Sequence, residues 1–581
     1  MPSRPNPFEA RLRALVGRIY PEADQKAICG QIVEAFWPEG SHRRKRARAP
    51  SNRLWSEQDA VLITYGNSIM DGTYKPLDLL EDFLTERMQG VVNGVHILPF
   101  FPFSSDDGFA VTDYRSVNPQ LGDWTDITRI ASQFHLMSDL VLNHVSSQGS
   151  WFHDYMQGRE PYDRFFYEGN PEDDLSQVVR PRTTPLLREV ETREGTRHVW
   201  CTFSHDQVDL DFTNPEVLLE MLRIIRMHID RGVRILRLDA VAFLWKEPGT
   251  PCIHLPQTHA IVQLMRLLCD YATETVVLLT ETNVPRTENL SYFGNRNEAH
   301  AVYNFPLPPL ILHAVQSGTA RYLHRWQSAM PPAQLGCAYL NFTASHDGIG
   351  MRPAEGVLPP EEQARMIEAV TAAGGLVSMR TLPDGREAPY ELNCSLFEAM
   401  RQTFHGEDEH HHDRFLCSQT IVMSLEGIPA FYIHALLATP NDHEQVEHRG
   451  MNRAINRHRW DYPALLKALA DDATPQARVL AALSARLRLR ARQAAFHPNA
   501  TQFTLALDER VFGVWRQSLD RDQSVFALHN VGGDELTIAP TAINLIDGED
   551  WIDILSGERI DALGPDVTMA PYQCRWITNR P

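Results

Sequence analysis

Short apolar runs alternate with longer amphipathic stretches along most of this chain. From about residue 60, eight runs are rich in β-branched and other apolar residues, as buried strands are, and helical patterns separate them. This alternation predicts an α/β protein built on a (β/α)8 TIM barrel. The predicted strands are Val61–Tyr65, Gly94–Pro99, Met137–Val145, Val233–Val241, Thr275–Glu281, Ala301–Phe305, Ala338–His346 and Ile428–Ile433.

One helix between these strands carries clear start and stop signals. Asn214 is a suitable N-cap, Pro215 suits the first helical position, and apolar residues then repeat at helical spacing. Gly232 follows just before the run Val233–Val241. The segment therefore predicts the helix-to-strand half of a βαβ unit.

The segments outside the barrel pattern differ in character. Residues 1–55 look helical and end in the basic run Arg43–Arg46, which we interpret as a solvated helix end. The stretches at about 146–205 and 348–410 are too long for simple connections and predict inserted subdomains. From 499 to 581 short β-rich runs predict a C-terminal β-domain, which leaves 56–498 for the catalytic barrel.

Composition narrows the classes of partner. The net charge of −19 would repel phosphates of nucleic acid, so no nucleic-acid partner is expected. The eight cysteines contain no Cys-x-x-Cys pair, and neither a signal segment nor a run long enough to span a membrane is evident. A cytoplasmic monomer or homodimer acting on small molecules is the expectation.

Polar and charged residues stand at the carboxyl ends of four predicted strands. The run Val233–Val241 is the clearest case, because it is apolar yet carries Arg237 and Asp239. Charges there indicate a site at the top of a barrel, although a structural ion pair is an alternative for this segment alone. The four clusters are Asp139–His144, Arg237–Asp239, Thr280–Asn283 and Ser345–Asp347.

Barrel geometry should bring three carboxyls, Asp239, Glu281 and Asp347, around one axis. Like charges repel, so at least one of these carboxyls should be shifted toward its protonated state. One ionised and one protonated carboxyl form the pair that glycosidic chemistry uses, a nucleophile and a general acid. The clusters therefore predict an enzyme that breaks or makes glycosidic bonds.

In this order on this barrel pattern, the clusters resemble the signature regions of the α-amylase superfamily, glycoside hydrolase family 13. The resemblance implies Asp239 as nucleophile, Glu281 as general acid/base and Asp347 as transition-state stabiliser. It also implies residues that bind the donor sugar or orient the nucleophile. These are Arg237 beside the nucleophile, His144 and His346 at sugar hydroxyls, and Gln207 in the short motif Gln207–Asp211.

Further stretches resemble the sucrose phosphorylase branch of that superfamily: Gly94–Pro102, Ser104–Phe109, Asn304–Pro309, Ser345–Gly350 and Ala454–His458. By this resemblance Asp106 and Arg457 hold the donor glucose, and Phe109 forms an apolar platform. Such contacts imply a pocket for one glucosyl unit rather than a cleft for a polymer.

The loop Arg180–Pro181–Arg182 matches an arginine-bearing loop of the branch, which implies that Arg182 meets phosphate. Phosphate must outcompete water near three carboxyls, and a planar guanidinium can bind two of its oxygens. A solvated loop arginine is the alternative. The second loop carries Tyr390 and Glu391, where sucrose phosphorylases have a glutamine beside the tyrosine, and this departure puts fructose as acceptor in doubt.

Within the branch, the chain resembles the glucosylglycerate phosphorylases more than the sucrose phosphorylases. The N-terminal extension, Trp245–Thr250, Leu340–Phe342 and Thr280–Pro285 carry this resemblance. It implies retaining, reversible phosphorolysis of 2-O-α-D-glucosyl-D-glycerate to α-D-glucose 1-phosphate and D-glycerate. Alternatives are phosphorolysis of sucrose, sucrose 6-phosphate or glucosylglycerol, α-glucosidase hydrolysis, and an inactive amylase-fold binding protein.

Neither a metal nor an organic cofactor is expected; inorganic phosphate would be the co-substrate. His410–His412 lies among acidic residues and is interpreted as a solvated polar turn. Asn143 matches a position that binds calcium in many amylases, but the branch that the chain resembles generally does without that ion.

Overall fold

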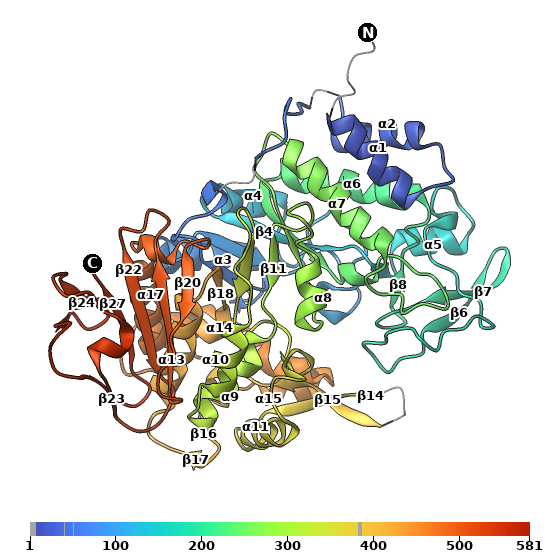
Figure 1. Cartoon of the computed structure of the whole chain (residues 1–581). Coiled ribbons are helices and arrows are strands. Elements are labelled where there is room, and N and C mark those ends of the chain that lie inside the picture. Colours follow the sequence, from blue (N-terminus) through green and yellow to red (C-terminus); the bar gives the residue numbers. More distant parts are fainter. Residues whose placement is uncertain (1–6, 40, 50–51, 382–385) are drawn as a thin grey trace, which may run out of the picture.

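The computed structural model describes residues 7–39, 41–49, 52–381 and 386–581. Eight parallel strands form a closed barrel in chain order, and the first strand pairs with both the second and the last (Figure 1). Each overlaps one predicted run, so the predicted barrel is confirmed. The strands are β1 (Val61–Thr64), β3 (Gly94–Ile97), β4 (His135–Val141), β9 (Val233–Asp239), β10 (Val277–Thr280), β11 (Ala301–Tyr303), β12 (Ala338–Asn341) and β18 (Ile428–Tyr432).

Two predicted strands end well before the end of their predicted runs. The run Met137–Val145 ends its barrel pairing at Val141, and His144–Ser146 forms a separate strand, β5, that pairs antiparallel with β8 (Gln207–Asp209). The run Ala338–His346 ends its pairing at Asn341, so His346 lies in the following loop. The polar residues that follow these two strands therefore lie beyond the carboxyl end of the barrel and are not part of its sheet.

Helices surround the barrel and connect its strands. The predicted signals around α6 (Pro215–Asp230) are present: the Asn214 side chain accepts a hydrogen bond of 3.1 Å from the Glu216 N–H, and Gly232 has a φ of +102°. Other helices of this layer are α3 (Pro76–Phe83), α4 (Trp124–Gln133), α7 (Pro256–Tyr271), α8 (Arg286–Ser291), α9 (Leu307–Ser317), α10 (Arg321–Ser328), α13 (His411–Ser424), α14 (Ile433–Leu436), α16 (Tyr462–Leu469) and α17 (Pro475–Arg490).

Two segments inserted after barrel strands stand over its carboxyl end. The first contains α5 (Ser150–Met156) and the hairpin of β6 (Leu187–Thr192) and β7 (Gly195–Trp200). The second contains α11 (Pro360–Ala372), α12 (Leu396–Ala399) and a three-stranded sheet of β13 (Ile349–Gly350), β14 (Leu376–Thr381) and β15 (Glu387–Asn393). Smaller elements are β16 (Gln402–Thr403), β17 (Gly406–Glu407) and α15 (His443–Arg449), and β2 (Ile69–Met70) pairs with β19 (Trp460–Asp461).

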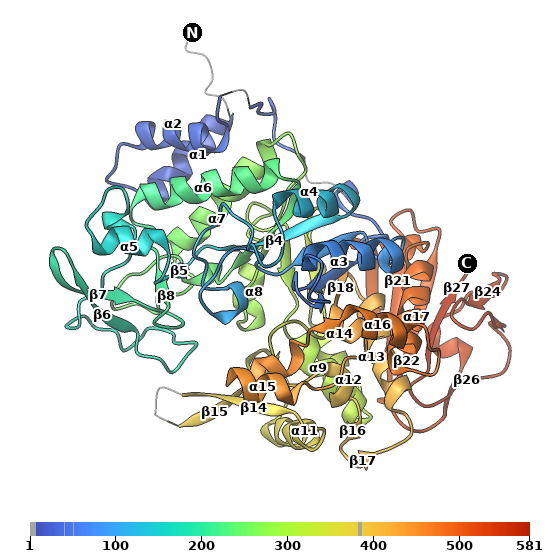
Figure 2. The same ribbon diagram turned by 180° about the vertical axis from the view of Figure 1, so that it is seen from behind.

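Both ends of the chain add a layer to the barrel. The helices α1 (Pro7–Ile19) and α2 (Gln25–Phe36) lie across α7 and α6 in both ribbon views (Figure 2). A six-stranded antiparallel sheet of β20 (Thr501–Thr504), β21 (Val511–Gln517), β22 (Ser524–Asn530), β27 (Cys574–Thr578), β24 (Trp551–Asp553) and β25 (Arg559–Ile560) covers the other side, with the pair β23 (Leu536–Ile538) and β26 (Val567–Met569). The principal hydrophobic core runs from Phe8 through the barrel to Trp576, so the domain limits at 55 and 498 stay predictions.

Candidate active site

A cavity above the barrel has nearly all the predicted site residues in its wall. Arg457 is the exception, because it lies outside this wall. The predicted residues that line the cavity are Asp106, Phe109, His144, Arg182, Gln207, Arg237, Asp239, Glu281, His346, Asp347, Tyr390 and Glu391. Residues far apart in the chain therefore meet in one place.

Asp239 ends β9 and is held by Arg237, which lies two residues earlier on the same strand. The period of two in a strand turns both side chains to the barrel interior. Arg237 Nη1 donates to Asp239 Oδ1 at 2.7 Å and also to Asp139 on β4. His96 on β3 contacts the other Asp139 oxygen at 2.6 Å. This buried network fixes the guanidinium beside Asp239.

Glu281 directly follows β10 and lies close to the same guanidinium. Arg237 Nη2 is 4.0 Å from Glu281 Oε1, and the N–H of Ala240 donates to Oε2 at 3.3 Å. Ala240 has a φ of +50°, a left-handed conformation that is uncommon outside glycine and costs free energy. Such strain next to two buried carboxyls is typical of a functional site.

The electrostatics favour different states for Asp239 and Glu281. Burial raises the pKa of both carboxyls, and the charge of Glu281 adds to the rise at Asp239. The pair therefore keeps a proton to higher pH than two exposed carboxyls would. Arg237 donates a direct hydrogen bond to Asp239 but stands 4.0 Å from Glu281, so the anion is favoured on Asp239 and the proton on Glu281.

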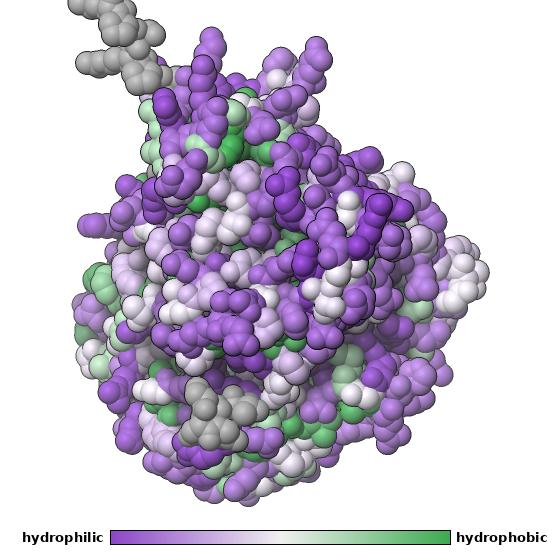
Figure 3. All heavy atoms as spheres, turned by 90° about the vertical axis from the view of Figure 1, so that its right-hand side faces the viewer, coloured by the Kyte–Doolittle hydropathy of each residue, from purple (hydrophilic) through white to green (hydrophobic). Residues whose placement is uncertain are grey.

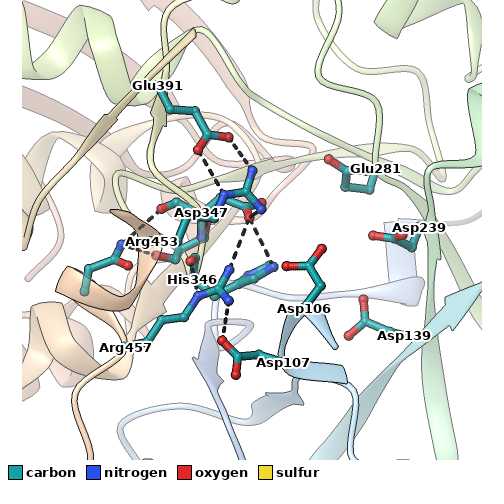
Figure 4. A network of polar contacts seen from close by, with 12 residues as sticks. Asp106, Asp107, Asp139, Asp239, Glu281, His346, Asp347, Glu391, Arg453 and Arg457 are labelled. Atoms are coloured by element: carbon teal, nitrogen blue, oxygen red, sulfur yellow. Dashed lines mark hydrogen bonds and ion pairs between the residues drawn. The ribbon is translucent and has the colours of Figure 1, made fainter. Parts of the chain in front are cut away.

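Asp347 lies in the loop after β12 among arginines. Arg453 Nη1 is 2.6 Å and Arg457 Nη2 3.8 Å from its Oδ1. Burial alone would raise the pKa of Asp347, but Arg453 and Arg457 hold it below the usual value. Arg453 also donates to both oxygens of Glu391, through Nε at 3.0 Å (Figure 4). Asp347 is therefore ionised, and Glu391 is engaged by Arg453.

The wall expected to hold the donor sugar combines an aromatic plane with polar groups. Phe109 and His346 stack with ring centroids 5.0 Å apart and an interplanar angle of 8°. The His144 ring nitrogen Nε2 is 3.1 Å from the Phe109 carbonyl oxygen and 3.2 Å from Gln207 Nε2. Gln207 also donates to Asp106 Oδ2 at 3.5 Å. These residues present one apolar face and several hydrogen-bonding groups.

Arg457 forms its ion pair with Asp107 and not with Asp106, the residue with which it was expected to hold the donor sugar. Its Nη1 donates to Asp107 Oδ2 at 2.5 Å, and Arg449 binds the other Asp107 oxygen. Asp106 and Asp107 both adopt φ near +50°, which sends consecutive carboxylates in different directions. Asp106 therefore lines the cavity, while Asp107 anchors Arg457 and, through it, the loop that carries His346, whose carbonyl accepts from Arg457 Nε at 2.8 Å.

The loops over the cavity carry the groups expected to meet phosphate and acceptor. The Arg182 guanidinium carbon lies 5.6 Å from the centroid of the Tyr390 ring, a cation–π contact between the two inserted segments. Arg182 is also among the cations that lower the pKa of Asp347, after burial and the nearer arginines. This guanidinium has no carboxylate partner among the residues that the structure describes.

Beside the site, a buried ammonium occupies the neighbourhood of Asn143. Lys246, 4% exposed, donates to Asn143 Oδ1 at 2.8 Å and lies 2.9 Å from Asp209 Oδ2. Asp209 also accepts from the N–H and hydroxyl of Thr202. The chain itself therefore supplies a positive charge here. Within the described part of the chain, no group of three or more His, Cys, Asp or Glu residues is arranged to hold a metal ion.

Several of these residues were not singled out from the sequence. His96 is a polar residue inside an apolar strand, so the pattern contained a signal for it. Arg453 immediately precedes the quoted stretch Ala454–His458, but nothing in its spacing separates it from other loop arginines. Lys246 lies in Trp245–Thr250, and this stretch indicated only a resemblance to the glucosylglycerate phosphorylases, with no role for the lysine.

The barrel and its converging carboxyls define a protein of the α-amylase class, and residues 84–348 match the model of the α-amylase catalytic domain. The chain belongs to glycoside hydrolase family 13, in the branch that contains the sucrose and glucosylglycerate phosphorylases. It is 45% identical to glucosylglycerate phosphorylase of Allomeiothermus silvanus over 95% of each chain. It is 40% identical to that of Escherichia coli K12 over 90% of this chain and 92% of the relative.

More distant relatives support the same placement. Sucrose phosphorylase of Agrobacterium vitis is 31% identical over 69% of this chain and 82% of its own. The crystal structure of sucrose 6F-phosphate phosphorylase from Thermoanaerobacter thermosaccharolyticum superposes with a TM-score of 0.71 at 24% identity, covering 88% of this chain and 98% of that one. This superposition supports the fold. No helix in the described residues is long and apolar enough to cross a membrane.

Proposed function

We propose that this protein catalyses reversible phosphorolysis of 2-O-α-D-glucosyl-D-glycerate, giving α-D-glucose 1-phosphate and D-glycerate with retention of configuration. Relatives named glucosylglycerate phosphorylase, 40–45% identical over at least 90% of this chain, support this assignment. The observation that carries it is that one cavity holds an arginine-bound carboxylate, a second buried carboxyl and Arg182, which has no carboxylate partner in the described part of the chain.

The two carboxyls suit a double displacement. Asp239, ionised by its bond to Arg237, attacks the anomeric carbon while Glu281 gives its proton to the departing glycerate oxygen. A covalent glucosyl–enzyme forms and the alcohol leaves. The Arg237 guanidinium lies 2.7 Å from an Asp239 oxygen and 4.0 Å from a Glu281 oxygen, so the two carboxyls flank one group. A retaining mechanism uses two such neighbouring carboxyls, about 5 Å apart. Asp347 would stabilise the positive charge that develops on the sugar ring.

Phosphate completes the reaction in place of water. Glu281, now ionised, accepts a proton from the attacking phosphate oxygen as that oxygen displaces Asp239 from the sugar. Arg182 supplies a cation that holds the phosphate in position, and its fork can bind two oxygens. We propose that phosphate is the only co-substrate needed. The proposed location is cytoplasmic, which the eight unpaired cysteine thiols support.

The test offers the purified protein glucosylglycerate, sucrose, sucrose 6-phosphate and glucosylglycerol, each with phosphate, and measures release of α-D-glucose 1-phosphate. Glucosylglycerate should give the highest kcat/KM, and Asp239→Asn should abolish turnover. Glucose release that does not depend on phosphate would identify a hydrolase instead.

Arg182→Ala should lower kcat/KM for phosphorolysis by about tenfold to a hundredfold, because a charge-assisted contact to phosphate is lost. Hydrolysis of the glucosyl–enzyme needs no such contact and should fall much less. Arg182→Lys, which keeps the charge without the planar fork, should lie between the two. Equal losses of phosphorolysis and hydrolysis in Arg182→Ala would contradict the role assigned to this arginine.

A further inference from the structure

Some of the positively charged side chains in the cavity wall have no carboxylate partner among the described residues. Among the described residues six arginines line the cavity, and three of them are paired with carboxylates. The paired ones are Arg237 with Asp139 and Asp239, Arg453 with Asp347 and Glu391, and Arg380 with Glu355. No ion pair within the described ranges engages the other three, which are Arg180, Arg182 and Arg352. Arg182 is already assigned to phosphate, so the other two arginines have no assigned role.

Arg180 carries the stronger sign of a missing partner. Its Nε and Nη2 atoms are buried and have no hydrogen-bond partner in the described structure. Burial lowers the pKa of this guanidinium, with no carboxylate to offset it. Leaving buried donors unpaired is unfavourable, and a ligand with two acceptor oxygens would satisfy both.

Arg352 reaches the same cavity from the second inserted segment, at the start of a single helical turn (Arg352–Ala354). The strand before it adjoins the residues that follow Glu281, since a Cβ on Gly350 would stand 3.1 Å from Asn283 Nδ2. Burial lowers the pKa of His254, and the charge of Arg352 is among those that lower it further.

The segment that carries Arg180 contacts the loop that carries His254, because the N–H of Val179 donates to the Pro251 carbonyl at 3.0 Å. Two guanidinium groups from different inserted segments, neither of them in an ion pair within the described ranges, therefore line one cavity.

The departing oxygen must lie within hydrogen-bond reach of Glu281, so the acceptor occupies the part of the cavity bounded by Glu281, Asn283 and Arg352. Asn283 presents a buried Oδ1 that lacks a partner among the described residues. This part of the wall therefore offers one cation and one hydrogen-bond acceptor, and Arg180 lines the same cavity.

We propose that Arg180 and Arg352 bind the carboxylate of a small hydroxy-acid acceptor, while Asn283 Oδ1 accepts a hydrogen bond from its remaining hydroxyl. The proposal rests on the proposed function and names the residues that select a charged acceptor. Arg182, which lies over Tyr390 and acts on Asp347, is left to bind phosphate. The two anions then have different arginines.

The experiment compares three reactions that start from α-D-glucose 1-phosphate. Transfer to D-glycerate uses the carboxylate site, transfer to glycerol offers a CH2OH group in place of the carboxylate, and exchange with labelled inorganic phosphate needs no acceptor. In both Arg180→Gln and Arg352→Gln, kcat/KM for D-glycerate should fall about tenfold to a hundredfold more than kcat/KM for glycerol or the exchange rate.

Arg380→Gln is the matched control, because Arg380 lines the same cavity but its charge is taken by Glu355 at 2.6 Å. This variant should keep the wild-type preference for glycerate over glycerol. Arg182→Gln should instead slow the phosphate exchange.

A wild-type protein that does not use D-glycerate at all would refute the proposed function. If the wild type uses D-glycerate and either Arg180→Gln or Arg352→Gln keeps the wild-type glycerate-to-glycerol preference, the carboxylate site is refuted and the function stands. The site is equally refuted if phosphate exchange in those variants falls as much as glycerate transfer.

Discussion

Glu281 shows how a single side chain can be unfavourable for stability and necessary for chemistry. Its folded-state pKa is raised by burial, so the folded protein holds a proton that the unfolded chain has lost. Stability should therefore fall as the pH rises from the unfolded pKa, about 4.3, through the folded value. A neutral amide at this position has no such dependence.

Glu281→Gln should consequently be more stable than the wild type at pH 8, by about 1 kcal/mol, with the difference vanishing toward pH 4. The same variant should lose turnover by a factor of about 100 or more, because it has no proton to give. Thermal unfolding across this pH range measures the first effect. Glu361→Gln on the exposed start of α11 is the control, and a difference that grows toward low pH would contradict the argument.

Strand periodicity alone pointed to two of the catalytic carboxyls. Asp239 and Glu281 are attached to apolar strands whose periodicity is visible, so their meeting follows from barrel geometry. Arg180, Arg352 and Arg453 come from loops, where no periodicity fixes the direction of a side chain. Their placement depends on tertiary contacts that a single sequence does not display.

At the scale of elements, apolar runs located all eight barrel strands but not where each strand ends. The run that continues β4 keeps its apolar character past Val141, yet His144–Ser146 pairs with β8 because the chain must leave the barrel to build the first inserted segment. The pattern of apolar residues indicates burial, and β4 and β5 are both buried. The sequence therefore does not show that β4 pairs within the barrel whereas β5 pairs with β8.

The junction between β5, β8 and the segment after β9 depends on Lys246. Lys246→Met should destabilise the protein by about 3–5 kcal/mol, because the Asp209 carboxylate would stay buried without its cation. Denaturant unfolding measures this change. Lys75→Met removes an exposed lysine that pairs with Asp123 and Asp126 and should have little effect. Similar losses in the two variants would show that burial of the pair is not the cause.

At the scale of the whole molecule, the barrel depends on the layers that both chain ends add. Phe8 on α1 is fully buried, with its ring 4.8 Å from that of Tyr271 on α7 and the Arg43 guanidinium 4.2 Å from its centroid. Phe8→Ala should lower the free energy of unfolding by about 3–5 kcal/mol.

No residue of α1 lines the cavity, so kcat/KM of the folded Phe8→Ala protein should match the wild type at moderate temperature. Phe503→Ala, a substitution of a 46% exposed ring on the C-terminal sheet, is the control and should change stability little. Loss of activity without loss of stability in Phe8→Ala would contradict a purely structural role.

The molecule is acidic overall and its surface is largely hydrophilic, as the face in Figure 3 shows, yet its cavity gathers arginines. Net charge is a property of composition, whereas this concentration of cations arises from folding. The sequence therefore indicated that positive charge must be concentrated locally, but it identified only Arg182 as a source of that charge.

The buried ammonium of Lys246 has a consequence for the conditions under which the protein works. A cation bound from solution is lost on dilution or to a chelator such as EDTA, and its occupancy varies with the supply of that ion. An ammonium joined to the backbone is present at a fixed ratio of one per molecule in every medium. The architecture around Asn143 and Asp209 is thus independent of ionic supply from the moment the chain folds.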